Sequence, residues 1–239
     1  MDVEEIKLRT IANLPTSINS MAIYPLSLKA IIDHGYYLYN RALNLISVQR
    51  NQLIDEEYAK QIPDEITTAD IIYHSGNQQL IRQFEESLKL FLKTDEIMYD
   101  YNSGLIINNK AINAEMFNEM IRVILIQNCF VASEEDAFNP LNERAKKIRE
   151  KMLENKKKIQ ELNSDSSDEG LTLSDLISIV CSNANGINIL NVFELNMFQF
   201  NDQFNRMKML DEYEINIQAL LHGADSKEIQ LKHWMSKIK

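Results

Sequence analysis

The sequence predicts a mainly α-helical fold, with one or two short β-hairpins in the N-terminal half and long helices in the C-terminal half. Three observations predict it. Six glycines and four prolines among 239 residues are too few for the turn-dense pattern of a β-sandwich. Apolar residues recur at helical spacing over much of the chain. The 45% apolar content is that of a protein of this length with a substantial buried core.

A first short hairpin is predicted within residues 5–26. Its two strands would lie on either side of the turn-like segment 13–17, which contains Pro15. In both flanks apolar side chains alternate with polar ones, which is the spacing of a half-buried strand. The alternating residues are Ile6, Leu8, Met21 and Ile23.

Two helical patterns follow the first hairpin. One begins after Ser27, which has the side chain of an N-cap, and we expect a single helix of roughly five turns. The other begins at Thr67 or Thr68 and runs to Leu92. Ser75-Gly76 interrupts this second pattern, so a break is expected there.

A second hairpin and another helix complete the predicted N-terminal half. The segments 96–101 and 105–108 flank Asn102-Ser103-Gly104, whose residue types favour a tight turn. Asn113 then has the side chain of an N-cap for a helix that continues to about Cys129.

The middle of the chain has a coiled-coil pattern. Between residues 141 and 162 a seam repeats at alternating spacings of four and three, and the segment is locally basic. Two interpretations stay open, an amphipathic helix packed on its own domain and a projecting or oligomerising helix. Residues 163–170 are polar and acidic, which is typical of a linker. The seam consists of Leu141, Ala145, Ile148, Met152, Asn155, Ile159 and Leu162.

The C-terminal part is predicted to be helical. A short helix capped by Thr172 or Ser174 would end near Asn185-Gly186. A long helix is then expected over residues 190–221, which contain no Gly or Pro and would span roughly 45 Å. We therefore expect an α+β region at 1–139, a basic heptad helix at 140–162, an acidic linker at 163–170 and a helical region at 171–239.

Composition favours a protein partner. The net charge of -10 disfavours general affinity for nucleic acid or for anionic lipid surfaces. Cys129 and Cys181 do not form a disulfide framework, so both are expected to be reduced and buried. We find no signal-peptide pattern at the first residues and no apolar run long enough to span a membrane, so cytoplasmic residence is expected.

The residues do not form a recognisable catalytic set. The four histidines lie in different segments, and none has the spacing of a zinc site. Nucleophile and phosphate-binding motifs are also missing from the sequence, so we expect neither an enzyme nor a metal or cofactor. Runs of carboxylates such as Glu85-Glu86 are expected to be solvated. A helix-turn-helix interpretation of 171–193 is disfavoured because the second helix carries almost no basic residue.

Apolar side chains on the two long helical patterns are the candidate partner-binding residues. Methionine and aromatic stripes can bind a partner helix, but a stripe at this spacing is more often core. Trp234 is a separate candidate because tryptophan is enriched at binding hot spots. The alternative for Trp234 is that it packs back on its own domain. The candidates are Trp234, Phe200, Phe204, Ile148, Met152 and Ile159.

Three stretches of the sequence resemble proteins from the morphogenesis modules of tailed bacteriophages that infect Gram-positive bacteria. The first is Ile23-Tyr24-Pro25-Leu26-Ser27-Leu28-Lys29, and the second is Gly104–Asn108 followed by Ile112–Phe117. The third runs from Phe200-Asn201-Asp202-Gln203-Phe204 through Tyr213–Asn216 to Lys232-His233-Trp234-Met235. Within these modules the chain is most similar to tail assembly chaperones.

The resemblance implies a non-enzymatic assembly protein that acts on the tape-measure or tail-tube protein of the phage. It implies a location in the cytoplasm of the infected bacterium, with association with the virion left open. A minor virion component is one alternative. Another is a dimeric regulatory or host-interaction protein that uses the heptad helix, and homo-oligomers fit both views. The heptad helix and the acidic linker are additions that the resemblance does not explain.

Overall fold

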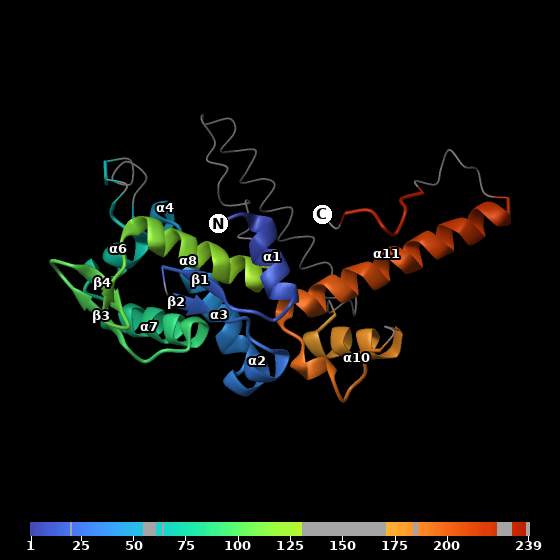
Figure 1. Cartoon of the computed structure of the whole chain (residues 1–239), viewed down its shortest axis with the longest axis horizontal. Coiled ribbons are helices and arrows are strands. Elements are labelled where there is room, and N and C mark those ends of the chain that lie inside the picture. The colour runs from blue at the N-terminus through green and yellow to red at the C-terminus, as the bar shows by residue number, and fades with distance from the viewer. Residues whose placement is uncertain are drawn as a thin grey trace, which may run out of the picture. The chain divides into compact units, whose positions relative to one another are not determined.

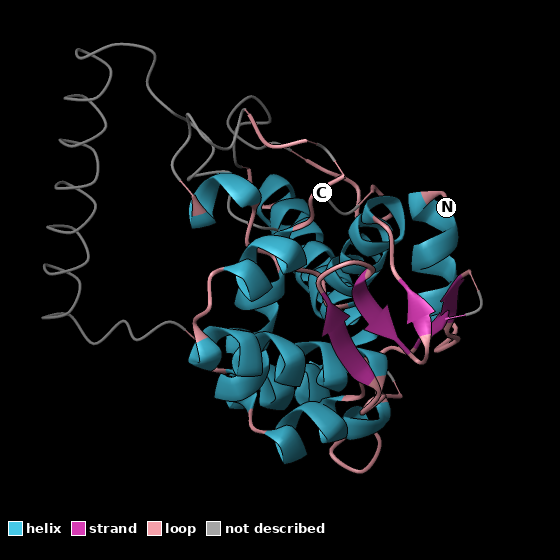
Figure 2. Ribbon diagram, turned by 90° about the vertical axis from the view of Figure 1, so that its left-hand side faces the viewer, coloured by secondary structure: helices cyan, strands magenta, loops and turns pink. Residues whose placement is uncertain are grey.

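The computed structural model describes residues 1–19, 21–54, 61–63, 65–130, 171–183, 186–223 and 231–237. The predicted heptad helix and acidic linker lie outside these described residues. The chain divides into two compact units, one formed by Met1–Val131 with Val180–Lys239 and the other by Ala132–Ile179. The four-part division expected from the sequence stays a prediction. Figure 1 follows the chain by colour, and Figure 2 separates its helices from its strands.

The predicted fold class is confirmed. The structure is mainly helical, with two small antiparallel sheets in the N-terminal half and long helices towards the C-terminus. Among the described residues the helices in the N-terminal half are α1 (Val3–Ile11), α2 (Leu28–His34), α3 (Tyr36–Ile46), α4 (Arg50–Leu53), α6 (Thr68–His74), α7 (Gln78–Leu92) and α8 (Ala114–Gln127). The strands are β1 (Thr16–Ile18), β2 (Met21–Ile23), β3 (Ile97–Asp100), β4 (Gly104–Ile107) and β5 (Lys110–Ala111). Towards the C-terminus lie α10 (Leu173–Asn183), the 3-10 helix η2 (Val192–Glu194) and α11 (Met197–Leu221).

A hairpin exists in this region, but its predicted first strand and its predicted turn at 13–17 are both wrong, because Thr16 and Ser17 lie in β1. Ile6 and Leu8 belong to helix α1, in which Ile6 is buried and Leu8 is exposed. The buried positions of α1 are Ile6 and Thr10, which are one helical turn apart and face the core together. The strands that do pair are β1 and β2, with Thr16 opposite Ile23.

The single helix expected after Ser27 is two helices. Ser27 caps α2 as predicted, because its hydroxyl accepts a hydrogen bond from the Ala30 amide at 3.2 Å. Gly35 then takes a φ of 101°, which glycine tolerates and other residues rarely adopt, so α2 ends and α3 begins there. Helix α3 packs on α7.

The other caps and turns of the N-terminal half are confirmed. Thr67 caps α6 in a capping box with Asp70, and the break at Ser75-Gly76 separates α6 from α7. Strands β3 and β4 form the second hairpin, and β5 adds a third strand that the sequence did not predict. Asn113 caps α8, accepting a hydrogen bond from the Met116 amide at 2.8 Å.

One hydrophobic core joins these elements. Its largest fully buried side chains come from α1, β2, α2, α3, α6, α7, β4 and α8. Both sheets and most helices of the N-terminal half therefore contribute to the core. Fully burying an aliphatic or aromatic side chain stabilises the fold by about 1.5–3 kcal/mol before conformational entropy is counted. These side chains are Tyr39, Phe84, Phe91, Ile6, Ile23, Leu28, Ile31, Ile72, Leu88, Ile107, Met120 and Ile124.

Helix α11 is long but begins later than predicted. Asn196 caps it through a capping box with Gln199, so the helix starts at Met197 and residues 190–196 contain η2 instead. Its 25 residues span roughly 38 Å rather than 45 Å. Asn196 also ties α11 to α1, because its side-chain amide donates to the Thr10 carbonyl oxygen at 2.8 Å. Thr172, one of the two predicted caps, is the cap of α10.

Both cysteines are free, as predicted, but neither is fully buried. Cys129 follows the end of α8 with a φ of 50°, outside the helix in which the sequence placed it. Burial raises the pKa of the Cys129 thiol, so the less reactive protonated form is favoured.

Candidate functional site

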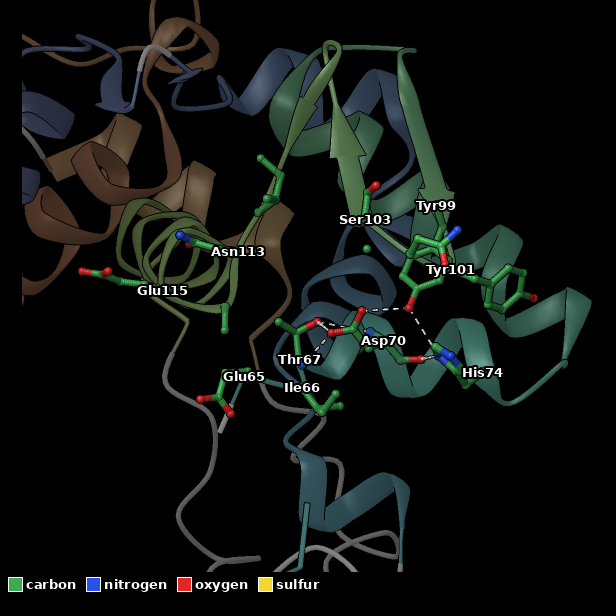
Figure 3. A pocket seen from close by; sticks show the side chains of 14 residues that line it. Glu65, Ile66, Thr67, Asp70, His74, Tyr99, Tyr101, Ser103, Asn113 and Glu115 are labelled. Atoms are coloured by element: carbon green, nitrogen blue, oxygen red, sulfur yellow. Dashed lines mark hydrogen bonds between the residues drawn. The ribbon is translucent and has the colours of Figure 1, made fainter. Parts of the chain in front are cut away.

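The most developed site on the described part of the chain is a polar pocket between α6, the β3–β4 hairpin and the start of α8. It has a volume of about 680 Å³, within the range of small-molecule pockets. In Figure 3 the Tyr99 hydroxyl points at Asp70 and His74, which lie on α6. The pocket is lined by Glu65, Ile66, Thr67, Asp70, His74, Tyr99, Tyr101, Asn102, Ser103, Gly104, Ile112, Asn113, Ala114 and Glu115.

Asp70 is the centre of the hydrogen-bond network. One carboxylate oxygen, Oδ2, accepts from the Thr67 amide and from the Thr67 hydroxyl, each at 2.7 Å. The other, Oδ1, accepts from the Tyr99 hydroxyl at 2.8 Å. The carboxylate therefore caps α6 and also fastens the hairpin to that helix. Hydrogen bonds to a charged acceptor such as this carboxylate are stronger than those between neutral groups.

The hydrogen bonds fix the tautomer of His74. Its Nδ1 lies 2.7 Å from the Asp70 carbonyl oxygen and 3.3 Å from the Tyr99 hydroxyl. A carbonyl oxygen only accepts, so Nδ1 must carry a proton and donate it to Asp70. Nδ1 then cannot accept from Tyr99, which leaves the Tyr99 proton to the Asp70 carboxylate.

Aromatic rings form one wall of the pocket. Tyr99 stacks on Tyr73 with ring centroids 4.2 Å apart and planes 9° from parallel. His74 and Tyr101 meet edge to face at 5.4 Å, and Tyr99 meets Tyr101 in the same way at 5.7 Å. Tyr101 is 75% exposed, so its ring is accessible to solvent while it contacts the rings of His74 and Tyr99.

The Tyr73 and Tyr99 hydroxyls remain protonated at neutral pH. Burial, followed by the hydrogen bond to the Asp70 carboxylate, raises the pKa of Tyr99. The pKa of Tyr73 is raised by burial and by its 2.8 Å hydrogen bond to Glu85. A tyrosine in this state donates a hydrogen bond and does not act as a base.

The rim of the pocket is acidic and polar. Glu65 and Glu115 are exposed and lie with the inner carboxylate of Asp70 around the same opening. Gly104 lies on the hairpin side of the pocket with a φ of 73°, a backbone conformation that favours glycine. Carboxylates beside exposed aromatic rings favour a cationic or amide-bearing group over an anion.

This cluster is not predicted by the sequence. The four histidines, His74 among them, lie in different segments, and residues 96–101 are predicted only as one side of a hairpin. One local signal was present: Asp70 and His74 are four apart on a helix and so share a face, whereas Tyr99 lies on β3 and Tyr101 in the turn that follows it. That the helix and the hairpin meet depends on packing between segments 29 residues apart.

The predicted partner-binding residues have different fates. Phe200 is buried, with 3% of its side chain exposed, so its ring packs inside the protein. Phe204 is half-buried, and Trp234 is 39% exposed. The carbonyl oxygens of Trp234 and Ser236 accept hydrogen bonds from Arg206, at 3.2 and 2.7 Å, which places this end of the chain against α11. The remaining three candidates, Ile148, Met152 and Ile159, lie outside the described residues, and partner binding stays a prediction.

The described residues contain no group of three or more His, Cys, Asp or Glu side chains placed to hold a metal ion. None of the helices in this part of the chain combines the length and the apolar character needed to cross a bilayer.

The sequence was compared with known proteins. The model of one family, described as the YomV second domain, matches residues 157–239. This family is associated with phages like Bacillus phage SPbeta, so the match supports a phage protein without specifying tail assembly. The matched stretch includes α10, α11 and Trp234. No curated protein and no solved structure matches the chain.

Proposed function

We propose that this chain is a non-enzymatic phage assembly protein, a tail assembly chaperone that binds the tape-measure or tail-tube protein in the host cytoplasm. The observation that carries the proposal is the match of residues 157–239 to a phage-associated family. The third and longest stretch of the chain's resemblance to tail assembly chaperones, from Phe200 to Met235, lies within these residues.

The pocket supports protein binding as the work of the N-terminal half. Its rings are held in place by stacking and by the Asp70 network, so little side-chain entropy is lost when a partner binds. The exposed ring of Tyr101 and the carboxylates of Glu65 and Glu115 suit a Lys or Arg side chain on a partner surface.

Co-expression tests the proposal. The full chain would be produced with the tape-measure protein and, separately, with the tail-tube protein of the same genome, and each mixture analysed by size-exclusion chromatography. We expect co-elution with one of them. Separate elution from both would contradict the chaperone assignment.

A matched pair of variants tests the contribution of the pocket. Tyr101→Ala is expected to weaken the co-eluting complex at least about tenfold, as the loss of an aromatic contact at an interface does. Tyr37→Ala is the control, because Tyr37 is 76% exposed, close to the 75% of Tyr101, but lies on α3 outside the pocket. Equal binding by both variants would remove the pocket from the proposal.

A minor virion component is the alternative within the same class. Mass spectrometry of purified virions separates the two: an assembly chaperone is expected to be absent from them, and a virion component is expected in a fixed number of copies.

A further inference from the structure

The charged side chains that line the polar pocket are all acidic. Glu65, Asp70 and Glu115 line it, and no Lys or Arg occurs among the described residues around its opening. Asp70 is occupied by the hydrogen bonds of Thr67 and Tyr99. Glu65 and Glu115 form neither an ion pair nor a side-chain hydrogen bond within the described part of the chain. Two carboxylates are therefore available to a positively charged group.

Three rings of the pocket stand at right angles to one another. The planes of His74, Tyr99 and Tyr101 meet at 86–90°, and their centroids lie 5.4–5.8 Å apart. One face of Tyr99 is covered by Tyr73, whereas Tyr101 is 75% exposed. The face of an aromatic ring carries partial negative charge, which attracts a cation. Tyr101 is thus a surface on which a planar cation can stack.

His74 adds a neutral acceptor to the two carboxylates. Its Nδ1 donates to the Asp70 carbonyl oxygen at 2.7 Å, so in the neutral ring the other nitrogen, Nε2, has a lone pair. The acceptors of the pocket come from separate elements: Glu65 precedes α6, His74 ends α6 and Glu115 lies on α8. A guanidinium group presents five N–H donors in a planar fork, whereas an ammonium group is a compact point charge. The forked group suits acceptors that are spread in this way.

The start of α8 does not reverse the preference for a cation. A helix N-terminus carries a partial positive charge that favours anions, and Asn113 and Ala114 line the pocket. Here Glu115 lies in the first turn of α8, so a full negative charge stands beside the partial positive one. The charge around the opening therefore stays negative.

We propose that this pocket binds the guanidinium group of an arginine side chain. The group would stack on Tyr101, and Glu65 and Glu115 would accept its hydrogen bonds. The volume of about 680 Å³ admits the guanidinium together with its aliphatic stem. The inference rests on the proposed assembly function, in which the arginine belongs to the bound phage protein, and it narrows the choice between Lys and Arg to Arg.

Three small probes test the arginine preference on the full chain. Nα-acetyl-arginine amide carries the proposed group, Nα-acetyl-lysine amide keeps the charge without the planar fork, and Nα-acetyl-citrulline amide keeps the shape without the charge. NMR titration at the Gly104 backbone amide measures the affinity, because Gly104 lines the pocket and Gly35, which lies outside it, serves as the reference. We expect the arginine probe to bind in the millimolar range and the other two at least about fivefold more weakly.

Matched variants separate the contribution of the ring from that of the charges. Tyr101→Ala removes the stacking surface and should weaken binding of the arginine probe about two- to fivefold. Tyr37→Ala is its control, an equally exposed tyrosine on α3 outside the pocket. Glu65→Gln combined with Glu115→Gln removes both available carboxylates and should weaken binding about fivefold. Glu86→Gln, an exposed carboxylate on α7 outside the pocket, is the control for this pair and should bind like the unmodified chain.

Three results would overturn the arginine site. They are a Gly104 amide that does not shift at probe concentrations far above the millimolar range, equal affinities for the arginine probe and either of the other two, and unchanged affinity in the double carboxylate variant. If a variant is unfolded by circular dichroism, the comparison of the three probes on the unmodified chain still decides.

The probes also separate this site from the proposed assembly function. Preferential binding of the arginine probe without co-elution of either phage protein contradicts the chaperone assignment and leaves the site in place. Co-elution without any preference for the arginine probe contradicts the arginine site and leaves the chaperone assignment in place.

Discussion

At the scale of single residues, the polar network around Asp70 holds the site together by one long-range hydrogen bond. Tyr99→Phe removes the hydroxyl that donates to Asp70 at 2.8 Å and leaves the stacked ring in place. Because the site is partly open to water, we expect a loss of about 1 kcal/mol in the free energy of unfolding. Urea denaturation measures it.

Tyr101→Phe is the control for Tyr99→Phe. Its side chain is 75% exposed, and removing its hydroxyl should leave the free energy of unfolding unchanged. Equal effects of the two substitutions would show that the Tyr99 hydroxyl does not join the hairpin to α6.

Thr16 is a buried residue whose unpaired hydroxyl is expected to lower the free energy of unfolding. Its hydroxyl is the buried side-chain polar atom without a hydrogen-bond partner in the described structure, and the residue is fully buried. Thr16→Val keeps the shape and removes the unpaired hydroxyl, so it should stabilise the fold by about 1 kcal/mol. Thr16→Ser keeps the hydroxyl and removes a methyl group, so its melting temperature should fall. A lower melting temperature for Thr16→Val would contradict this view of the residue.

Asp100 makes the turn of the second hairpin sensitive to acid. Its carboxylate accepts hydrogen bonds from the Ser103 amide at 2.8 Å and the Asn102 amide at 2.9 Å, and these bonds lower its pKa. A lowered pKa in the folded state means that the stabilisation is present above the ordinary range of aspartate and is lost as the pH falls through the folded value. The stability difference between the unmodified chain and Asp100→Asn should therefore shrink on acidification below that range. Denaturant titrations at several pH values measure it, and a difference independent of pH would argue against the carboxylate's role.

At the scale of elements, Asn196 couples α11 to the N-terminal half. It caps α11 through the Gln199 amide and also donates to the buried Thr10 carbonyl oxygen, and its side chain is fully buried. Asn196→Ala should cost about 2–3 kcal/mol, one part from the cap and one from the acceptor left without a donor. Denaturant unfolding measures the change. Asn113→Ala, which removes only the cap of α8, should cost about 1 kcal/mol. Similar costs for the two would contradict the coupling.

The helix caps also show what local sequence can predict. Ser27 and Asn113 each accept a hydrogen bond from the amide three residues later, so a short-range pattern was enough to predict both caps. The start of α6 was predicted at Thr67 or Thr68, and the structure shows that Thr67 is its cap. The start of α11 was misplaced because the apolar residues before Asn196 fit a helical stripe, and the capping box at Asn196 overrides that stripe. Ile6 and Leu8 fit both a strand and a helix, and only packing on the core decides between them.

The pocket could not be predicted from local sequence patterns for a different reason. Its two halves come from α6 and from the β3–β4 hairpin, and their meeting is a result of tertiary packing. Each residue type was visible in the sequence, but neither Asp70 nor Tyr99 has a local feature that points to the other. A hollow of about 390 Å³ between α3 and α7 is similar, since its lining combines Ala42 and Ser87, two small residues 45 positions apart in the sequence.

At the scale of the whole molecule, the heptad pattern makes a prediction about self-association. The pattern at 141–162 predicts that an oligomer becomes monomeric when residues 141–170 are deleted. Light scattering of the full chain and of the shortened chain measures this, and an unchanged mass would contradict a dimerising role for the heptad helix. A shortened chain of single-copy mass would favour the heptad helix.

The docking of residues 231–237 on α11 gives the molecule a built-in optical probe. Trp234 is the single tryptophan of the chain, so its emission comes from one place. The backbone around it is tied to α11 by Arg206, and the neighbouring His233 ring lies 5.0 Å from that of Tyr213. Release of this terminal segment would expose the indole to water and shift its fluorescence to the red. Stopped-flow fluorescence can therefore follow the undocking in real time, in the unlabelled protein and in the presence of phage partners.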